Sequence, residues 1–153
     1  MRAHQHSAGA IGGQEFELLG RSRGGFSTKI HARVDSLGRP HQILLSPGQS
    51  HECQKAIDLI KGSEAGFIAG DRGYDTEEVR SYLKYCGIKA VIPPCSNRTK
   101  KYRYNKEIYK ERNIVERFFA RIKQYRRIAT RYDKTSKMFM SALSLVGILL
   151  WLK

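Results

Sequence analysis

The chain is poor in cysteine. Its 153 residues contain three, Cys53, Cys86 and Cys95, with no CxxC pair and no metal-ligand spacing. This pattern argues against a structural zinc site or a disulfide framework. An odd cysteine count without a signal peptide favours a reducing, cytoplasmic location.

Long apolar runs are also scarce. The longest apolar stretch covers residues 138–152 and is interrupted by Ser141, Ser144 and Gly147. A membrane-spanning helix needs about 20 apolar residues. The stretch is therefore predicted to be a buried core helix, and no membrane partner is expected.

Acidic residues are few, with 14 Asp and Glu against 28 Lys and Arg, which gives a net charge of +14. Such an excess on a small protein points to a polyanion, most often nucleic acid. A ribosomal-type or merely soluble basic protein is the alternative. Residues 98–137 hold 15 of the basic residues and only four acidic ones, so the positive charge is localised.

The hydropathy pattern predicts one α/β domain. Residues 1–25 lack periodicity and are interpreted as a flexible basic lead, followed by a folded core over residues 26–153. The expected elements of this core are a hairpin (26–34 and 40–45), a helix (50–61), a strand (66–70), a helix (76–85), a strand (89–92) and two helices (107–127 and 135–152). Alternating strands and helices imply a mixed, partly parallel sheet with helices on both faces.

Asp71 directly follows the short apolar strand, in the context Ala-Gly-Asp-Arg-Gly-Tyr-Asp. Ligands of open α/β sheets gather at the carboxyl ends of strands, so Asp71 is a candidate metal ligand. Asp also commonly ends a strand or begins a turn. The local context does not decide between these two readings.

Four residues of the helix predicted over 107–127 form one stripe: Tyr109, Arg112, Glu116 and Lys123. At about 100° per residue they fall within an arc of roughly 60°. On an ordinary solvated helix, Glu and Lys more often lie four residues apart. The stripe suits a helix that presents one oxygen ligand beside groups that hold phosphate.

Glu116 is the second candidate carboxylate. Mg²⁺ binds through a few carboxylates plus substrate phosphate, and two such ions can assist phosphodiester chemistry. The alternative is an ordinary surface pair between Glu116 and either Arg112 or Arg121.

The basic residues of the stripe are suited to binding phosphate. Arg112 can grip a phosphate bidentately, whereas Lys123 acts as a point charge, although both could be solvated partners of nearby Glu. Tyr109 could stack beside an unpaired base or belong to the core. Further along the chain, Arg126, Arg127 and Arg131 extend the basic face and are predicted to follow the nucleic-acid backbone.

The stripe has the spacing Tyr-x2-Arg-x3-Glu-x6-Lys, which resembles the signature of bacterial insertion-sequence DDE transposases. Asp71 and its neighbours resemble the region of that family's second catalytic Asp. The run Gly-Arg-Ser-Arg-Gly-Gly-Phe-Ser-Thr-Lys-Ile-His at residues 20–31 is similar to the insertion-sequence-five-like branch. The resemblance covers nearly the whole chain.

The resemblance implies a ribonuclease-H-like fold, a Mg²⁺ or Mn²⁺ cofactor, and cutting and rejoining of DNA at element ends. It assigns Asp71 and Glu116 as catalytic metal ligands. The DNA-binding residues that we expect with them are Tyr109, Arg112, Lys123, Arg126 and Arg127.

The family's first catalytic Asp lies just ahead of a stretch similar to residues 2–6, so it would precede Met1. We therefore expect the C-terminal catalytic part of a transposase, with its central first strand largely missing. Asp35 lies upstream of Asp71 but is interpreted as a turn residue of the hairpin. Frameshift fusion to an upstream part and a degraded copy of the element both remain open.

The function predicted from the sequence is a DNA transposase catalytic domain that needs an upstream segment for its first Asp. One alternative is a truncated, non-catalytic fragment that binds DNA or inhibits transposition, and another is a basic RNA-binding protein. The expected partners are DNA, both terminal inverted repeats and target, and either a second copy of the chain or the upstream transposase part.

Overall fold

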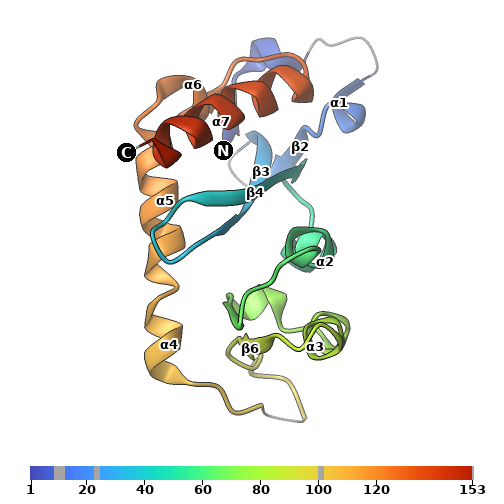
Figure 1. Cartoon of the computed structure of the whole chain (residues 1–153). Coiled ribbons are helices and arrows are strands. Elements are labelled where there is room, and N and C mark those ends of the chain that lie inside the picture. Colours follow the sequence, from blue (N-terminus) through green and yellow to red (C-terminus); the bar gives the residue numbers. More distant parts are fainter. Residues whose placement is uncertain (9–12, 23–24, 100–101, 153) are drawn as a thin grey trace. The chain divides into compact units, whose positions relative to one another are not determined.

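The computed structural model describes residues 1–8, 13–22, 25–99 and 102–152 (Figure 1). The chain divides into two compact units, unit 1 (Met1–Ser50 and Val115–Lys153) and unit 2 (His51–Ile114). Each unit has its own cluster of buried apolar residues, whereas the sequence alone suggests one domain.

Unit 1 is built on a mixed five-stranded sheet. The predicted hairpin is confirmed, with β3 (Gly25–Val34) antiparallel to β4 (Pro40–Pro47). Strand β1 (Arg2–Ala3) lies between β3, to which it is antiparallel, and β7 (Thr130–Arg131), to which it is parallel. The strand pattern agrees with the mixed sheet expected from the sequence.

The described part of residues 1–25, for which the sequence shows no periodicity, contains regular secondary structure. This part holds four regular elements: β1, the 3₁₀ turn η1 (Gln5–Ala8), α1 (Gly13–Phe16) and β2 (Gly20–Ser22), which is antiparallel to β3. Leu19 is buried, and the hydroxyl of Thr28 donates a hydrogen bond to the carbonyl of Leu18. These contacts involve distant residues, so local periodicity gave no sign of them.

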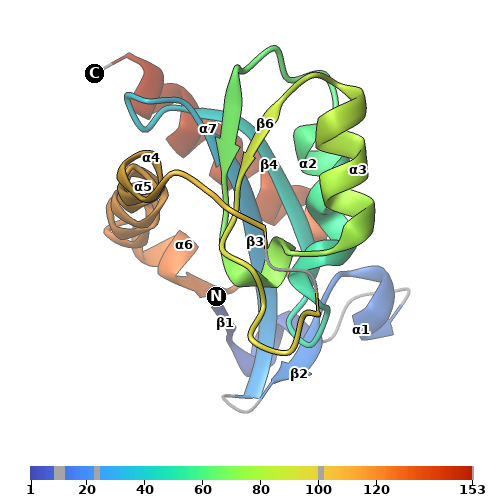
Figure 2. The ribbon, with the colours of Figure 1, turned by 90° about the horizontal axis from the view of Figure 1, so that it is seen from below.

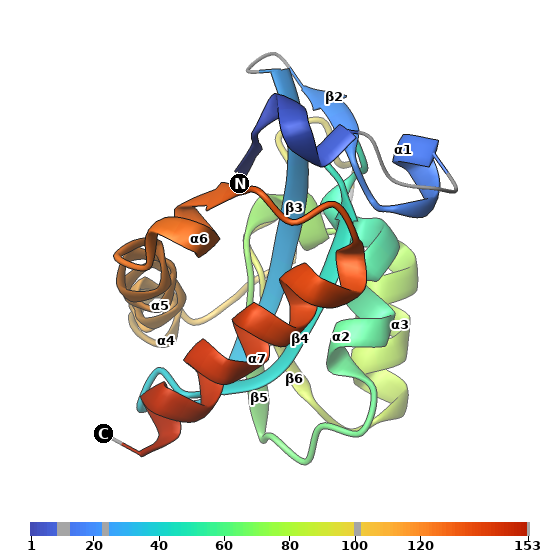
Figure 3. The ribbon, with the colours of Figure 1, turned by 90° about the horizontal axis from the view of Figure 1, so that it is seen from above.

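The C-terminal helix α7 (Ser136–Trp151) begins where the sequence predicts. The hydroxyl of Thr135 caps it by accepting a hydrogen bond from the amide of Met138. Helix α7 packs against β4, and Figure 3 shows it crossing the hairpin. Phe139 and Leu143 are buried, whereas Leu145 is 64% exposed, so the predicted core helix is confirmed on one face only. Among the described residues, no helix is long and apolar enough to cross a membrane.

The prediction of a single long helix over residues 107–127 is wrong. The structure has three shorter helices there, α4 (Lys106–Lys110), α5 (Asn113–Lys123) and α6 (Arg126–Ala129). At the end of α4, the amides of Glu111 and Arg112 donate hydrogen bonds to carbonyl groups three residues earlier, instead of four. Such bonds use the last carbonyl groups of a helix and end its regular ladder.

Unit 2 contains a separate pair of parallel strands, β5 (Phe67–Ala69) and β6 (Lys89–Val91). The helical elements around it are η2 (Glu52–Lys55), α2 (Ala56–Ile60), η3 (Arg72–Tyr74) and α3 (Glu77–Tyr85). Figure 2 shows α2 and α3 on the same side of the strands, where they share one apolar core. Within unit 2, β5 and β6 form a two-stranded parallel sheet.

The helix starts of unit 2 agree only partly with the sequence. Helix α3 begins within one residue of the predicted start, and the hydroxyl of Thr76 caps it by accepting a hydrogen bond from the amide of Val79. The helix predicted over residues 50–61 begins later, with the 3₁₀ turn η2, and His51 occupies the cap position.

Candidate functional site

Asp71 lies at the carboxyl end of a parallel strand, as the sequence predicts. Strand β5 ends at Ala69, and the amide of Gly70 donates to the carbonyl of Val91 at 3.3 Å. Asp71 then begins the 3₁₀ turn η3 with extended backbone angles. Its side chain is 51% exposed, so its carboxylate is accessible to a ligand.

The carboxylate of Asp71 is paired with a residue of the Tyr-Arg-Glu-Lys stripe. Nη1 of Arg112 donates to Oδ1 of Asp71 at 2.6 Å. The guanidinium of Arg112 lies 5.6 Å from the ring centroid of Tyr109, whose ring meets Tyr104 edge to face. Three predicted site residues, Asp71, Arg112 and Tyr109, are therefore brought together within unit 2.

A buried ionic network, centred on Asp75, fixes the turn that carries Asp71. The carboxylate of Asp75 accepts hydrogen bonds from Nε of Arg80 at 2.6 Å and from the amide of Cys95 at 2.7 Å. Nε of Arg98 lies 3.1 Å from its second oxygen. Arg80 also donates to the carbonyl of Ile92, so the network joins the turn to the chain leaving β6.

Electrostatics stabilise the charged form of Asp75. Burial alone raises the pKa of this carboxyl, but the Cys95 amide and the guanidinium of Arg80 outweigh it and hold the pKa below its ordinary value. Asp75 belongs to the same sequence motif as Asp71, but the motif alone does not predict its role. The signal that could have revealed it is Arg80, a basic residue five positions later on the predicted helix.

Gly73 of the Asp71 turn lies close to the carboxylate of Glu52. A Cβ atom at Gly73 would lie 2.7 Å from Oε2 of Glu52, so a larger residue there would displace the end of the Glu52 side chain. The neighbouring Tyr74 is partly buried, and burial, Glu52 and Asp71 raise the pKa of its hydroxyl to about 12. The ring therefore stays neutral and acts as packing beside Asp71.

Glu116 and Lys123 lie on α5 in unit 1, and both side chains are exposed. Phe118 and Ile122 on the same helix are buried. At about 100° per residue, Glu116 and Lys123 project roughly 140–160° away from Phe118, on one common stripe. The helix thus presents a carboxylate and an ammonium together on its solvent face.

The donor chemistry of the two carboxylates suits a hard divalent cation, which prefers oxygen ligands. Asp71 belongs to unit 2 and Glu116 to unit 1, so their joint action on a metal stays a prediction. Over the described residues, no group of three His, Cys, Asp or Glu side chains gathers that could hold a metal by itself.

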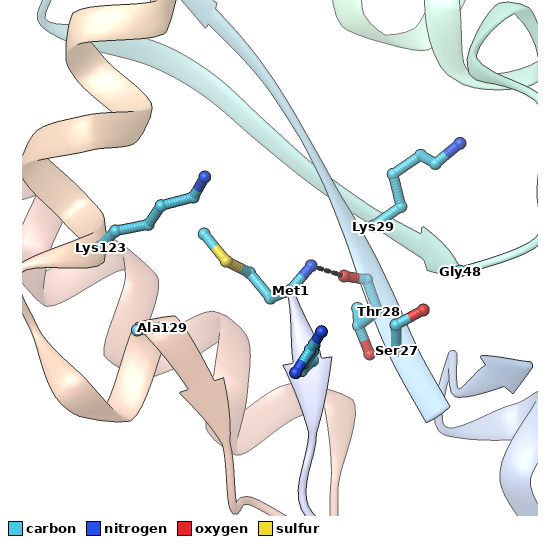
Figure 4. Close-up of a pocket in the computed structure, with 8 residues that line it drawn as sticks. Met1, Ser27, Thr28, Lys29, Gly48, Lys123 and Ala129 are labelled. Atoms are coloured by element: carbon cyan, nitrogen blue, oxygen red, sulfur yellow. Dashed lines mark hydrogen bonds between the residues drawn. The ribbon is translucent and has the colours of Figure 1, made fainter. Parts of the chain in front are cut away.

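A cavity of about 470 Å³ lies beside Lys123, wholly within unit 1 (Figure 4). Its lining includes Lys123 of α5, Arg2 of β1 and Lys29 of β3. Nζ of Lys29 donates to the carbonyl of Ser50 at 2.7 Å. Lys123 is a predicted DNA-binding residue, whereas local spacing predicts no role for Lys29 or Arg2.

The three arginines after α5 differ in their surroundings. Arg126 is exposed, and Arg127 is 64% exposed while it pairs with Asp133 at 2.5 Å. Arg131, in contrast, is fully buried, and its Nη1 donates to the hydroxyl of Thr28 at 2.7 Å. The prediction that Arg131 extends the basic surface is therefore wrong, because its donors hold the fold together.

Asp35 is confirmed as a turn residue. One of its oxygens accepts hydrogen bonds from the amides of Leu37 and Arg39, and the other accepts from Nε of Arg39. Burial raises the pKa of Asp35, but these bonds from Arg39 and Leu37 outweigh it and keep the pKa below its ordinary value.

Comparisons with known proteins give the family. Residues 68–153 match the model of the family described as "Transposase DDE domain". A putative transposase for insertion sequence element IS6501 of Brucella ovis is 35% identical over 130 residues, which cover 83% of this chain and 99% of that relative. The transposase for insertion sequence element IS1106 of Neisseria meningitidis serogroup B is 33% identical over 101 residues, which cover 60% of this chain and 34% of that relative. No solved structure matches. The chain therefore belongs to the DDE transposases of bacterial insertion sequences.

Proposed function

We propose that this chain is the catalytic part of a DNA transposase, which cleaves phosphodiester bonds and transfers strands at the ends of its insertion sequence. The observation that carries the proposal is the 2.6 Å contact between Asp71, at the carboxyl end of β5, and Arg112 of the signature stripe. Membership of the DDE family and the high net positive charge support it.

In this proposal Asp71 and Glu116 hold Mg²⁺ or Mn²⁺ through their carboxylate oxygens. A bound divalent cation supplies Lewis acidity, which activates the attacking oxygen and neutralises charge on the leaving one. Asp71 is suited to this role because the Asp75 network holds the turn that carries it, while its own side chain stays accessible.

The basic residues position DNA. The guanidinium of Arg112 can leave Asp71 for a phosphate of the substrate, which it can grip with two parallel hydrogen bonds. Tyr109 packs beside Arg112 and offers a ring for an unpaired base. The exposed side chains of Lys123, Arg126 and Arg127 contact the DNA backbone, which fixes the register without reading sequence.

The proposal has three further parts. The chain has a ribonuclease-H-like fold, it belongs to the insertion-sequence-five-like branch of the family, and a segment upstream of Met1 supplies the first catalytic Asp. The partners are the terminal inverted repeats, the target DNA, and either a second copy of the chain or the upstream part.

A metal-dependent nicking assay tests the function. DNA that carries the element ends is incubated with Mg²⁺ or Mn²⁺ and either this chain or the chain fused to its upstream coding region. Cleavage that disappears in Asp71→Ala and Glu116→Ala, but persists in the exposed control Asp58→Ala, supports a transposase. Cleavage by the fusion alone supports an upstream Asp.

The alternative is a fragment that binds DNA without cutting it. Metal-independent binding to the element ends, with no nicking by either protein, would overturn the catalytic proposal in favour of this alternative.

A further inference from the structure

We infer that Tyr102 is a positioning residue, which fixes the segment that carries Arg112 and so holds the Arg112 guanidinium against Asp71. The inference rests on the proposed function and deepens it, because Arg112 grips a substrate phosphate in that proposal. Every residue in the argument belongs to unit 2. Local spacing predicts no role for Tyr102, since its hydroxyl bonds to Glu77, 25 positions earlier.

Tyr102 is held at the start of α3 by both its hydroxyl and its ring. The hydroxyl donates to the two carboxylate oxygens of Glu77, at 3.0 and 3.2 Å, and the same carboxylate accepts from Nη1 of Arg98 at 2.9 Å. The ring centroid lies 4.2 Å from Cζ of Arg80 and 5.0 Å from Cζ of Arg98. A guanidinium within about 6 Å of a ring centroid is attracted to the face of the ring.

The chain between β6 and α4 is anchored to the Asp75 network at successive points. The amide of Cys95 donates to the carboxylate of Asp75 at 2.7 Å, and Nε of Arg98 lies 3.1 Å from the same carboxylate. Tyr102 continues this series through its contacts with Glu77. Of these anchors it lies nearest in sequence to α4, so it has the most direct influence on where that helix begins.

Helix α4 depends on its ends for its position. None of its residues, all of which the structure describes, is buried, so no apolar face fixes it. Asn105 caps it by accepting hydrogen bonds from the amides of Glu107 and Ile108. A helix of this length spans only about 7.5 Å. A displacement at Tyr102 is therefore carried through α4 to Arg112.

The pair of Arg112 and Asp71 does not place this segment by itself. The two side chains are 26% and 51% exposed, and an exposed ion pair contributes little after the loss of side-chain entropy. The contacts of Tyr102 supply the missing order before Arg112 meets its partner. Arg112 is then held beside Asp71 at 2.6 Å, ready to exchange this carboxylate for a phosphate.

Nitrogen-15 NMR of the arginine side chains in the full chain, without metal or DNA, tests the positioning directly. The Arg112 signals are assigned by their loss in Arg112→Gln. A guanidinium held by a carboxylate gives distinct Nη signals, whereas a released one gives averaged signals. We expect Tyr102→Ala to average the Arg112 signals, and Tyr102→Phe, which keeps the ring, to average them in part. Tyr85→Ala changes a tyrosine of α3 that is 88% exposed and, as the matched control, should leave them unchanged.

Isothermal titration with Mn²⁺ separates positioning from a merely structural role. Tyr102→Ala should raise the Mn²⁺ affinity of the DNA-free chain by up to about fivefold, the gain expected when Arg112 leaves Asp71. The same change in an Arg112→Gln chain should raise it no further, because the competing guanidinium is already absent. A residue that only stabilises the fold would give no such gain. Thermal unfolding identifies any variant that has lost its fold, and if Tyr102→Ala is unfolded, Tyr102→Phe decides.

DNA cleavage should fall by up to about 100-fold in Tyr102→Ala, because a displacement of about 1 Å can cost that much. The inference is wrong if Tyr102→Ala and Tyr102→Phe keep the wild-type Arg112 signals, or if Tyr85→Ala changes them equally. The proposed function fails separately, if the wild-type chain and its upstream fusion neither bind Mn²⁺ nor cut element-end DNA while the Arg112 signals still respond to Tyr102.

Discussion

Nη1 of Arg112 lies 2.6 Å from Oδ1 of Asp71, so a cation of the signature stripe already neutralises the candidate metal ligand. The two residues lie 41 positions apart in sequence. Arg112 immediately precedes α5, and Asp71 immediately precedes η3. A metal ion and the guanidinium of Arg112 would compete for the same oxygen of Asp71.

This competition predicts the effect of Arg112→Gln on the DNA-free chain. We expect its Mn²⁺ affinity to rise by up to about fivefold, because a partly exposed ion pair is worth at most about 1 kcal/mol. DNA cleavage should fall at the same time, because a phosphate contact is lost. Isothermal titration with Mn²⁺ and the nicking assay measure the two effects, with Arg121→Gln on α5 as the control. An unchanged Mn²⁺ affinity would argue against competition at Asp71.

The buried position of Asp75 predicts a large loss of stability in Asp75→Ala. This change leaves Arg80 and the amide of Cys95 without their buried acceptor. Breaking a buried ion pair costs about 3–5 kcal/mol. Urea unfolding of unit 2 measures the loss. Asp58→Ala removes a carboxylate that is 59% exposed and should cost less than about 1 kcal/mol. Similar losses in both variants would contradict the role of the network.

The same carboxyl group predicts how stability depends on pH. The pKa of Asp75 in the folded chain lies below its ordinary value of 3.8. The unfolded chain therefore binds the proton more readily, and the stabilisation is present above 3.8 and disappears as pH falls through the folded-state pKa. Urea midpoints between about pH 6 and about pH 2 should drop more steeply for wild type than for Asp75→Asn. Parallel curves would show that Asp75 does not contribute.

Variants of Arg131 and Arg126 distinguish a role in folding, expected for Arg131, from a role in DNA binding, expected for Arg126. Arg131→Met removes the donors of bonds to the hydroxyl of Thr28 and the carbonyl of Glu17, and we expect a loss of more than about 3 kcal/mol. Arg126→Gln changes an exposed side chain and should alter stability by less than about 0.5 kcal/mol while weakening DNA binding. Urea unfolding and fluorescence anisotropy measure both effects. A stable Arg131→Met variant with weakened DNA binding would restore the surface interpretation of Arg131.

Several features were predictable because they depend on neighbouring residues. Alternating side chains predict the β3–β4 hairpin, and Thr76 predicts the start of α3. Asp35 is recognisable as a turn residue because its bonds reach only two and four residues along the chain. The position of Asp71 after an apolar strand is likewise a local property.

Other features depend on residues that the sequence does not place together. Local spacing suggests one helix over residues 107–127. The amides of Glu111 and Arg112 instead bond to carbonyl groups three residues earlier, and this interrupts the helix. In the sequence, Arg126 and Arg131 both look like basic surface residues. Only the fold shows that Arg131 is buried and that Arg126 is exposed.

Residue types and their spacing are enough to predict the family, the charge and the candidate carboxylates. Which charged groups have partners becomes known only from the folded chain. Arg131 meets Thr28 across 103 positions, and Arg112 meets Asp71 across 41. The physical reason is that charged side chains gain their partners and their burial from packing between distant segments, which local periodicity does not specify.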